Sequence, residues 1–236
     1  MKQYLKSILR NFGYQINRFP SGLDKTMIDL LNKKEIDLIL DVGANTGQFS
    51  NKLRDIGYNG RIISFEPLQN EFKELKKNSE KDVNWEVNNF AFGNEDKDLF
   101  INVAGNSYSS SFLEMNDRHI ENAPQSKYIG TQKAKMKKLE TYLNENPVLK
   151  KHKIYLKLDV QGFEKNVILG AEKVLNNIKG IQLELSFDEL YKGETLFSSM
   201  VEFLDKKDFY LCHISPEFTS PNNNKLLQVD TVFFRD

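Results

Sequence analysis

The stretch Ile36-Asp-Leu-Ile-Leu-Asp-Val-Gly-Ala-Asn-Thr-Gly47 decides the fold of this chain. An apolar run ends in Asp41, and Gly43 and Gly47 then lead into a polar segment, 48–56, that suits a helix. This order predicts a strand, a tight turn and a helix. Because a side chain at either glycine would hold a ligand away from the backbone, the turn is suited to close contact. The free N–H groups at the helix start favour a carboxylate or a phosphate.

A second strand carries the acid that a nucleoside site needs. The stretch Gly60-Arg-Ile-Ile-Ser-Phe-Glu66 predicts a strand that ends in an acid nineteen residues after Gly47. An acid at about this spacing binds a ribose diol at the next strand tip. An ordinary strand–helix turn would explain one glycine, but not Gly43 and Gly47 together with Asp41 and Glu66.

The spacing of the glycines distinguishes between two kinds of nucleotide. A dinucleotide fingerprint requires three glycines as GxGxxG, whereas here Asn45 fills the middle position and the third glycine is absent. The loop therefore resembles motif I of the class I methyltransferases, which bind S-adenosylmethionine (SAM). Binding of NAD is the alternative, and Asn45 disfavours it.

Length and composition limit the function classes. A chain of 236 residues suits one α/β domain, alone or with a short appendage. The 33 basic and 33 acidic residues give no net charge, so bulk electrostatics do not favour nucleic acid as a partner. Cys212 is the one cysteine, which excludes an internal disulfide and a CxxC metal site. Without a membrane-length apolar run or a signal-peptide core, we expect a soluble, cytoplasmic protein.

The chain is expected to consist of a lead-in, residues 1–22, and one main domain, residues 23–236. The lead-in is basic and amphipathic, which suits either a helix packed on the main domain or a helix that docks on a membrane surface or a partner. Residues 1–20 contain four basic side chains, too few for firm anchoring, so packing is expected and membrane contact is not.

Strands and helices alternate through the main domain. Helices are predicted at 23–33, 48–56, from after Pro67 to about Ser79, 163–175 and 196–204. Strands are predicted at 36–40, 60–66, 85–88, 153–159, 181–185, 209–214 and 229–235. The last two strands have no helix between them, which predicts an antiparallel edge. The expected fold is α/β, a class I methyltransferase Rossmann-like sheet, mostly parallel, with an antiparallel edge strand from a C-terminal β-hairpin.

An insertion is expected between the third and fourth core strands, at about 98–132. It is predicted to contain a hairpin of 100–103 with 110–113, followed by a polar loop at 116–132 over the site. The segment 136–143 is predicted to be a short strand leading into a helix. The acceptor pocket is expected in the insertion.

From Leu38 onward the chain resembles one family of that fold, the FkbM-type methyltransferases. The blocks that carry the resemblance are Leu40-Asp-Val-Gly-Ala-Asn-Thr-Gly47, Ser64-Phe-Glu-Pro67, Asn89-Phe-Ala-Phe-Gly93, Leu156-Lys-Leu-Asp-Val-Gln-Gly-Phe-Glu-Lys-Asn-Val-Ile-Leu-Gly-Ala171 and Ile181-Gln-Leu-Glu184. One departure is Gln161, where family members commonly carry Glu.

The resemblance implies SAM-dependent methyl transfer to a hydroxyl of a sugar or polyketide-type small molecule. It implies that Gly43 to Asn45 line the methionine part of SAM, that Glu66 accepts from the ribose hydroxyls and that 89–92 flank adenine. The cofactor-binding residues expected in all are Asp41, Gly43, Ala44, Asn45, Gly47, Glu66, Pro67, Asn89, Ala91, Phe92 and Asp159.

Methyl transfer to a hydroxyl requires alignment of the acceptor and removal of one proton. Asp159, at the tip of the fourth strand, and Glu184, near the tip of the fifth, are candidate bases. The alternative for Asp159 is an N-cap or turn acid, and the alternative for Glu184 is a salt-bridged strand acid. Lys157 shares a strand face with Asp159 and could pair with it. His213 is a further candidate base, although a core histidine is the commoner case.

The remaining polar residues leave alternatives open. His119 and His152 are expected at the surface, and Ser109, Ser110 and Ser111 either contact a ligand or form a polar hairpin tip. Two acids at adjacent strand ends could hold Mg²⁺. However, the paired Asp/Asn signature of metal-dependent O-methyltransferases does not follow the fifth strand, so no obligatory metal is expected.

Three other functions remain as alternatives. The acceptor could be an amine or a carboxyl, the chain could be a catalytically inactive SAM-binding scaffold, or it could be an NAD enzyme. The sequence does not give the acceptor or the oligomeric state.

Overall fold

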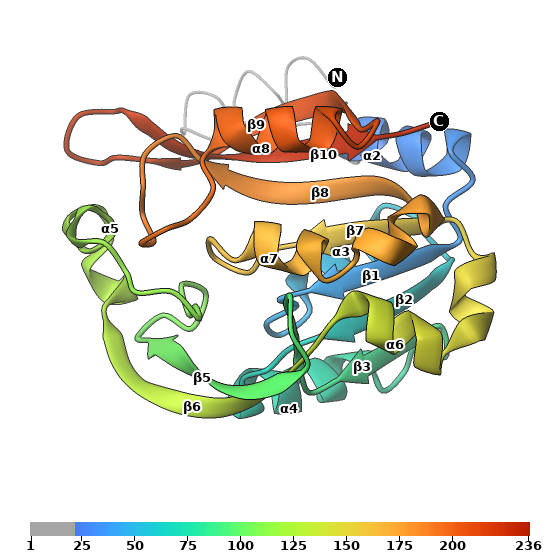
Figure 1. Ribbon diagram of the computed structural model, residues 1–236, viewed down its shortest axis with the longest axis horizontal. Helices are drawn as coiled ribbons and strands as arrows, with labels where there is room; N and C mark the ends of the chain where they lie inside the picture. The colour runs from blue at the N-terminus through green and yellow to red at the C-terminus, as the bar shows by residue number, and fades with distance from the viewer. Residues whose placement is uncertain (1–21) are drawn as a thin grey trace, which may run out of the picture.

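The computed structural model describes residues 22–236 (Figure 1). The predictions for residues 1–20, a packed lead-in helix without membrane contact, lie outside the described residues. Within 22–236, no helix has both the length and the apolar character needed to cross a membrane. The division of the chain after residue 22 stays a prediction.

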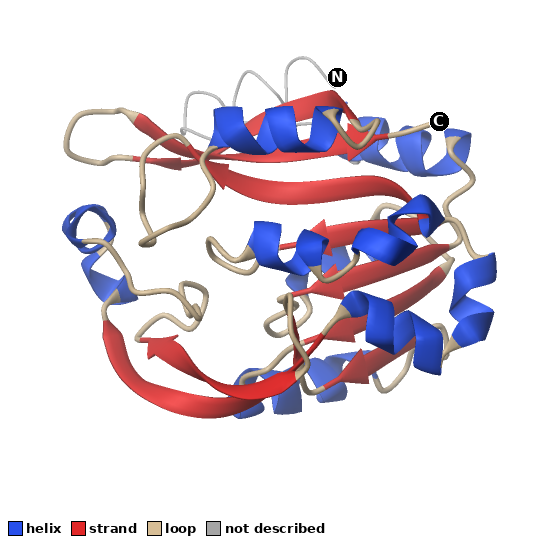
Figure 2. Cartoon of the chain, in the orientation of Figure 1, coloured by secondary structure: helices blue, strands red, loops and turns tan. Residues whose placement is uncertain are grey.

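A seven-stranded sheet forms the centre of the molecule (Figure 2). Its strand order is β3-β2-β1-β7-β8-β10-β9; the first five of these run parallel, and β10 is antiparallel to β8 and β9. The strands are β1 (Leu38–Val42), β2 (Arg61–Phe65), β3 (Trp85–Asn88), β7 (Ile154–Leu158), β8 (Ile178–Ser186), β9 (Tyr210–Thr219) and β10 (Leu226–Phe234). The predicted α/β class is confirmed, including the antiparallel edge formed by the C-terminal hairpin.

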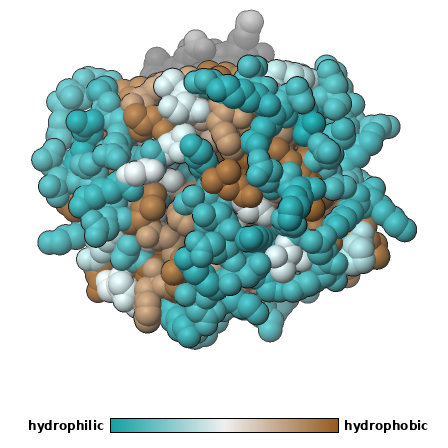
Figure 3. All heavy atoms as spheres, viewed as in Figure 1, coloured by the Kyte–Doolittle hydropathy of each residue, from teal (hydrophilic) through white to brown (hydrophobic). Residues whose placement is uncertain are grey.

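Helices cover both faces of this sheet, because alternate residues of a strand point to opposite faces. In β1, Leu38 and Leu40 belong to the apolar cluster beneath α6, α7 and α8, whereas Ile39 belongs to the cluster beneath α2, α3 and α4. The helices are α2 (Gly22–Lys33), α3 (Gln48–Asp55), α4 (Gln69–Ser79), α6 (Leu139–Glu145), α7 (Glu164–Leu169) and α8 (Phe197–Asp205), with the 3₁₀ helices η2 (Pro147–Lys151) and η3 (Glu172–Asn177). Outside these clusters, hydrophilic residues cover most of the face seen in Figure 3.

The insertion is a ribbon of two long strands that curves past one end of the sheet (Figure 1). The strands are β5 (Lys97–Ala104) and β6 (Tyr128–Lys137), which pair antiparallel, and the short β4 (Ala91–Phe92) pairs with β6. Between β5 and β6 lie α5 (Asp117–Asn122) and the 3₁₀ helix η1 (Pro124–Ser126).

The predicted hairpin of 100–103 with 110–113 is wrong except for one antiparallel bridge, because β5 pairs along its length with β6 instead. This bridge joins Asn102 to Ser111 of the serine segment, residues 109–111. Its hydroxyls bind backbone groups: Ser110 Oγ accepts from the N–H of Ala104, and Ser111 Oγ donates to the carbonyl of Gln161. Such local side-chain bonds compete with a strand ladder.

The predicted loop at 116–132 is also wrong, since this segment contains α5, η1 and the first half of β6. The Asn116 side chain caps α5 by accepting from the N–H of Arg118 at 3.2 Å. The predicted helix 163–175 is divided into α7 and η3 at Gly170, where a Cβ would lie 1.9 Å from the carbonyl oxygen of Gly93. This close backbone contact ends α7.

The expectation of a surface position is wrong for His119. Its side chain is 4% exposed and packs against Tyr191 and Phe218, with ring centroids at 5.1 and 5.9 Å. His152 is half-buried, with Nδ1 2.9 Å from Oδ2 of Asp37. The six residues of α5 are too few for a hydrophobic pattern to predict that His119 points inward.

Candidate active site

The turn after β1 is held between the ends of β2 and β7. Gly43 has a φ of +76°, and the N–H groups of Gly43 and Ala44 donate to the carbonyl of Phe65 at 3.0 and 3.1 Å. A Cβ at Gly43 would lie 1.9 Å from the backbone oxygen of Asp159. Glycine is therefore required for the turn to contact both neighbouring strands.

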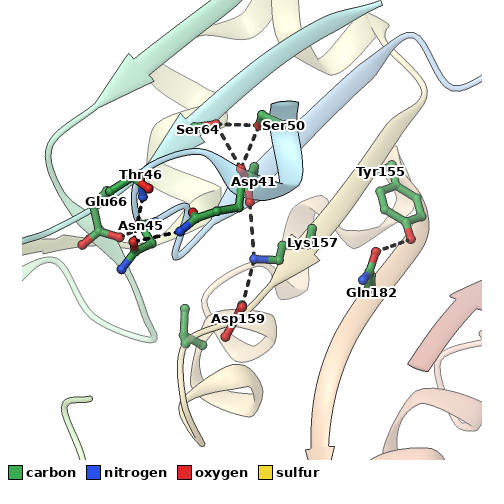
Figure 4. A network of polar contacts seen from close by, with 12 residues as sticks. Asp41, Asn45, Thr46, Ser50, Ser64, Glu66, Tyr155, Lys157, Asp159 and Gln182 are labelled. Carbon is green, nitrogen blue, oxygen red and sulfur yellow. Dashed lines mark hydrogen bonds and ion pairs between the residues drawn. The ribbon is translucent and has the colours of Figure 1, made fainter. Parts of the chain in front are cut away.

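Glu66 holds the same turn from the end of β2. Its carboxylate is buried and accepts from the N–H group of Asn45 at 2.8 Å (Figure 4). It also accepts from the N–H group of Leu68 at 2.8 Å. Burial raises the pKa of Glu66 to about 7, while the two backbone hydrogen bonds oppose the rise. The carboxyl thus changes protonation state near neutral pH.

A cavity of about 270 Å³, called here the small cavity, opens beside Glu66. The predicted cofactor residues that line it are Gly43, Asn45, Glu66, Pro67, Ala91, Phe92 and Asp159. Ser110 and Ser111 of the insertion line it as well, whereas Ser109 is buried and donates to Ser126 at 3.0 Å. The structure therefore brings most of the predicted cofactor residues around one space.

Three of the predicted cofactor residues line neither this cavity nor its larger neighbour. The Asn89 amide donates to the carbonyls of Glu66 and Pro67 at 2.8 and 3.1 Å. A Cβ at Gly47 would lie 2.7 Å from the ring of Trp85, so this glycine permits packing at the start of α3. The third, Asp41, is fully buried. These residues support the site without lining either cavity.

The larger neighbour, called here the large cavity, has a volume of about 370 Å³ and lies between α2, α3 and the strands β7 to β10. Met27, Leu30 and Phe49 form part of its apolar wall, and Ala44 also lines it. The residues that line both cavities are Gly43, Asn45, Tyr108, Asp159, Glu184 and Glu217. The two predicted catalytic acids thus lie where the cavities meet. Of the insertion, only Tyr108 lines the large cavity among the described residues.

Strand pairing places polar residues of four strands on one sheet face. Asp41 is paired with Lys157, and Lys157 with Gln182, while Glu184 is paired with Asp230 on the antiparallel β10. Residues directly paired across strands point to the same face. This register, and not the sequence spacing, assembles the polar floor of the large cavity.

Lys157 connects two acids of this floor. Its Nζ lies 3.5 Å from Asp41 and 3.2 Å from Asp159 (Figure 4). Burial by itself would lower the pKa of Lys157, but the charges of Asp159 and Asp41 outweigh it and the pKa is raised. Asp41 also accepts from the hydroxyls of Ser50 and Ser64 at 2.8 and 3.1 Å. Lys157 therefore stays charged and acts as a counter-ion.

Two further acids on this face are perturbed by their surroundings. Burial raises the pKa of Glu184, and the charges of Asp159 and Asp230 raise it further. Burial also raises the pKa of Asp230, to about 6, with Glu217 and Asp159 acting in the same direction and Lys157 opposing. The sequence analysis did not select Asp230. The signal that could have indicated it is an acid within an apolar strand.

Gln161 links the two predicted catalytic acids. Its Nε2 donates to Oδ1 of Asp159 at 2.8 Å and to Oε2 of Glu184 at 2.9 Å, while its Oε1 accepts from the Tyr191 hydroxyl at 2.6 Å. The sequence marks Gln161 as a departure from a family pattern, but gives no sign that its amide lies between two carboxylates.

His213 lines the large cavity, and its Nε2 is buried without a hydrogen-bond partner among residues 22–236. In the same part of the chain, no group of three or more His, Cys, Asp or Glu side chains could hold a metal ion. The Gln161 amide donates to both Asp159 and Glu184 and so bridges these two carboxylates without a shared cation.

The chain is similar at low identity to two solved methyltransferase-fold structures. TehB from Haemophilus influenzae is 12% identical, with a TM-score of 0.47 over 90% of this chain and 62% of TehB, so the chain spans less than two thirds of that protein. An rRNA methylase from Streptococcus thermophilus is 11% identical, with a TM-score of 0.47 over 94% of this chain and 99% of that one. Likenesses of this size carry no argument about function.

Sequence comparison is more informative. The 2-O-methyltransferase NoeI from Sinorhizobium fredii (strain NBRC 101917 / NGR234) is 21% identical over 208 residues, which are 85% of this chain and 84% of NoeI. The methyltransferase FkbM domain matches residues 41–211, a range that includes the glycine turn, Glu66, Asp159 and Glu184. The predicted family is confirmed: this chain belongs to the FkbM methyltransferases.

Proposed function

We propose that this methyltransferase transfers the methyl group of SAM to a hydroxyl of a small-molecule or saccharide acceptor. The observation that carries the proposal is the meeting of two cavities at Asp159 and Glu184. One cavity has the features of a nucleoside site, and the other offers room for a second molecule. A two-substrate transfer needs this arrangement, because the reacting atoms must meet away from water.

The small cavity fits SAM through Glu66. A buried carboxylate beside a cavity is suited to accept from two ribose hydroxyls, since hydrogen bonds to an ionised acceptor are the strong ones. Ala91 and Phe92 would contact adenine, and the backbone of the turn at Gly43 to Asn45 would contact the methionine part. When bound, SAM supplies an electrophilic methyl group on a sulfonium with a good leaving group.

The large cavity fits a polyol with an apolar ring face. Phe49 and Leu30 can contact C–H groups, while Lys157, Gln182 and Asp230 provide donors and acceptors for hydroxyls. The similarity to NoeI, which is named a 2-O-methyltransferase, supports a hydroxyl acceptor. We propose that the acceptor binds here and not chiefly in the insertion.

An amine acceptor is the second candidate. Asp159, Glu184, Glu217 and Asp230 all line the large cavity, and carboxylates of this number would attract a cation. Product analysis therefore has to distinguish transfer to oxygen from transfer to nitrogen.

Calorimetry with SAM, S-adenosylhomocysteine and NAD tests the cofactor. We expect the first two to bind and NAD not to bind. Because ionised Glu66 is the better acceptor and its pKa is about 7, SAM affinity should rise between pH 6 and pH 8. Glu66→Gln should weaken SAM binding by roughly 10-fold or more and flatten this pH dependence. Glu86→Gln, at an exposed acid of β3, is the matched control. Undiminished SAM affinity in Glu66→Gln would refute the cofactor assignment.

A screen of nucleotide sugars and glycans with radiolabelled SAM tests the acceptor. We expect one methyl group on a hydroxyl of the product, established by mass and by linkage analysis. A methyl on nitrogen, on protein or on RNA would refute the sugar proposal.

A further inference from the structure

One carboxylate oxygen of Glu184 is hydrogen-bonded to protein groups, and the other is open. Its Oε2 accepts from two side-chain amides, Gln161 at 2.9 Å and Gln228 at 3.1 Å. Within residues 22–236, no group donates to Oε1. Because Glu184 lines both cavities, this oxygen is available where they meet.

Asp159 differs from Glu184 in that both of its oxygens are engaged. Oδ1 accepts from Gln161 at 2.8 Å, and Oδ2 accepts from the ammonium group of Lys157 at 3.2 Å. With both oxygens engaged, the Asp159 carboxylate presents no free oxygen to an acceptor hydroxyl. Asp159 is therefore better suited to hold Lys157 than to take a proton.

The Gln161 amide is held in one orientation. The residue has a φ of +53°, in the left-handed region, and its carbonyl accepts from Ser111 Oγ at 2.7 Å. Because Tyr191 donates to Oε1, the NH₂ group faces the two acids, and each of its hydrogens serves one carboxylate. A neutral donor at this position lets both acids lie close together without a third charge.

We propose that Glu184 takes the proton of the acceptor hydroxyl, and that Gln161 and Gln228 are positioning residues that leave its Oε1 free for this step. The proposal rests on the proposed function. The O–H bond breaks and its proton goes to Oε1, while the electron pair stays on oxygen and forms the bond to the methyl carbon. The S–CH₃ bond breaks and its pair goes to sulfur, so a carboxylic acid, a methyl ether and a thioether result.

The surroundings of Glu184 make its carboxylate a stronger base than that of an exposed glutamate. Burial raises its pKa, and the neighbouring acids raise it further. The titratable groups that face it are Asp159 and Lys157 near the end of β7, Glu164 of α7, Tyr191 after β8, Asp230 of β10, and His213 and Glu217 of β9. Lys157 is engaged by Asp159, and a second cation, Lys52 of α3, lines the large cavity.

The first test needs no acceptor. Protein labelled with ¹³C at glutamate carboxyls is titrated by NMR, and Glu184→Gln identifies the resonance. We expect Glu184 to titrate above the ordinary pKa of glutamate, and Gln161→Glu, which adds a third carboxyl, to raise that pKa by about one unit. Gln69→Glu adds an acid at an exposed position that lines neither cavity and should leave it unchanged. The proposal is overturned if Glu184 titrates at or below the ordinary pKa of glutamate. It is also overturned if Gln161→Glu leaves the pKa of Glu184 unchanged.

The second test uses the acceptor from the screen. Glu184→Gln should lower kcat by about 100-fold or more while SAM affinity stays within a few-fold, and Asp159→Asn should lower kcat by less than about 10-fold. Gln161→Glu should shift the acidic limb of the kcat profile by as much as the NMR titration shifts. A larger loss of kcat in Asp159→Asn than in Glu184→Gln overturns the proposal. If wild-type protein does not bind SAM, the proposed function fails; if SAM binds and the Glu184 results fail, only this inference does.

Discussion

At Gly43 the chain comes closer to a neighbouring strand than any side chain would permit. The position has a positive φ, and an added Cβ would meet the Asp159 carbonyl oxygen at 1.9 Å. The carbonyl belongs to the residue that engages Lys157 and Gln161. A displacement here would therefore reach Asp159 and the two side chains that it engages, as well as the turn after β1.

Gly43→Ala separates this contact from the conformational strain of a positive φ. Gly57 is the matched control, because its φ is +100° and an added Cβ would meet nothing within 4 Å. We expect Gly57→Ala to lower the free energy of unfolding by about 1–2 kcal/mol and leave SAM binding intact. Gly43→Ala should cost about 3 kcal/mol or more and weaken SAM binding. Urea denaturation and calorimetry measure the two effects, and equal losses in both variants would contradict the steric argument.

Among the elements, α5 is held to the body of the protein by a buried histidine. His119 packs between Tyr191 and Phe218, and burial lowers its pKa to about 4. Ser220 also donates to Asn122 at the end of α5 at 2.5 Å. The helix therefore depends on a histidine that must stay neutral.

The sign of the resulting pH effect follows from the lowered pKa. Between about pH 6.5 and pH 4, the unfolded chain binds a proton at His119 that the folded chain does not, so stability falls as pH falls. The loss from pH 7 to pH 5 amounts to about 2 kcal/mol. His119→Phe keeps the aromatic packing and should remove this part of the acid sensitivity. Denaturation of both proteins at the two pH values measures it, and an identical loss in the variant would disprove the assignment.

For the whole molecule, buried carboxyls act in the opposite direction. Burial raises the pKa of Glu164 to about 8, although its Oε1 accepts from the N–H groups of Val160 and Gly162, each at 3.2 Å. Glu66 has a pKa of about 7 for the same main reason. Above the ordinary pKa of glutamate, the folded chain holds protons that the unfolded chain has lost, so stability falls as pH rises.

We therefore expect the free energy of unfolding to decrease between pH 6.5 and pH 8. Glu164 should contribute about 1.5 kcal/mol to this decrease, since its folded pKa lies at the upper end of the range. Glu164→Gln keeps a carbonyl oxygen for the two backbone donors and removes the titration. Thermal or urea unfolding across this range should show a flatter pH dependence in the variant, and an unchanged slope would count against a raised pKa at Glu164.

The sequence by itself determined the β–α order, the turn at Gly43, the acid at the end of β2 and the antiparallel C-terminal edge. These features are local, because hydrophobic periodicity, glycine positions and short connections operate over a few residues. The family resemblance, which the FkbM domain match confirms, also depended on short blocks of sequence. The assigned roles of the site residues stay predictions.

Only the tertiary structure decided which segments and side chains meet. β5 pairs along its length with β6, on the far side of α5, and meets the serine segment at one bridge only. Strand register places Glu184 beside Asp230. Gln161 lies between two carboxylates because a left-handed backbone turns its amide inward. Register and packing depend on residues far apart in the chain, and a shift of one residue reverses the face to which each side chain points. No local pattern in the sequence contains that information.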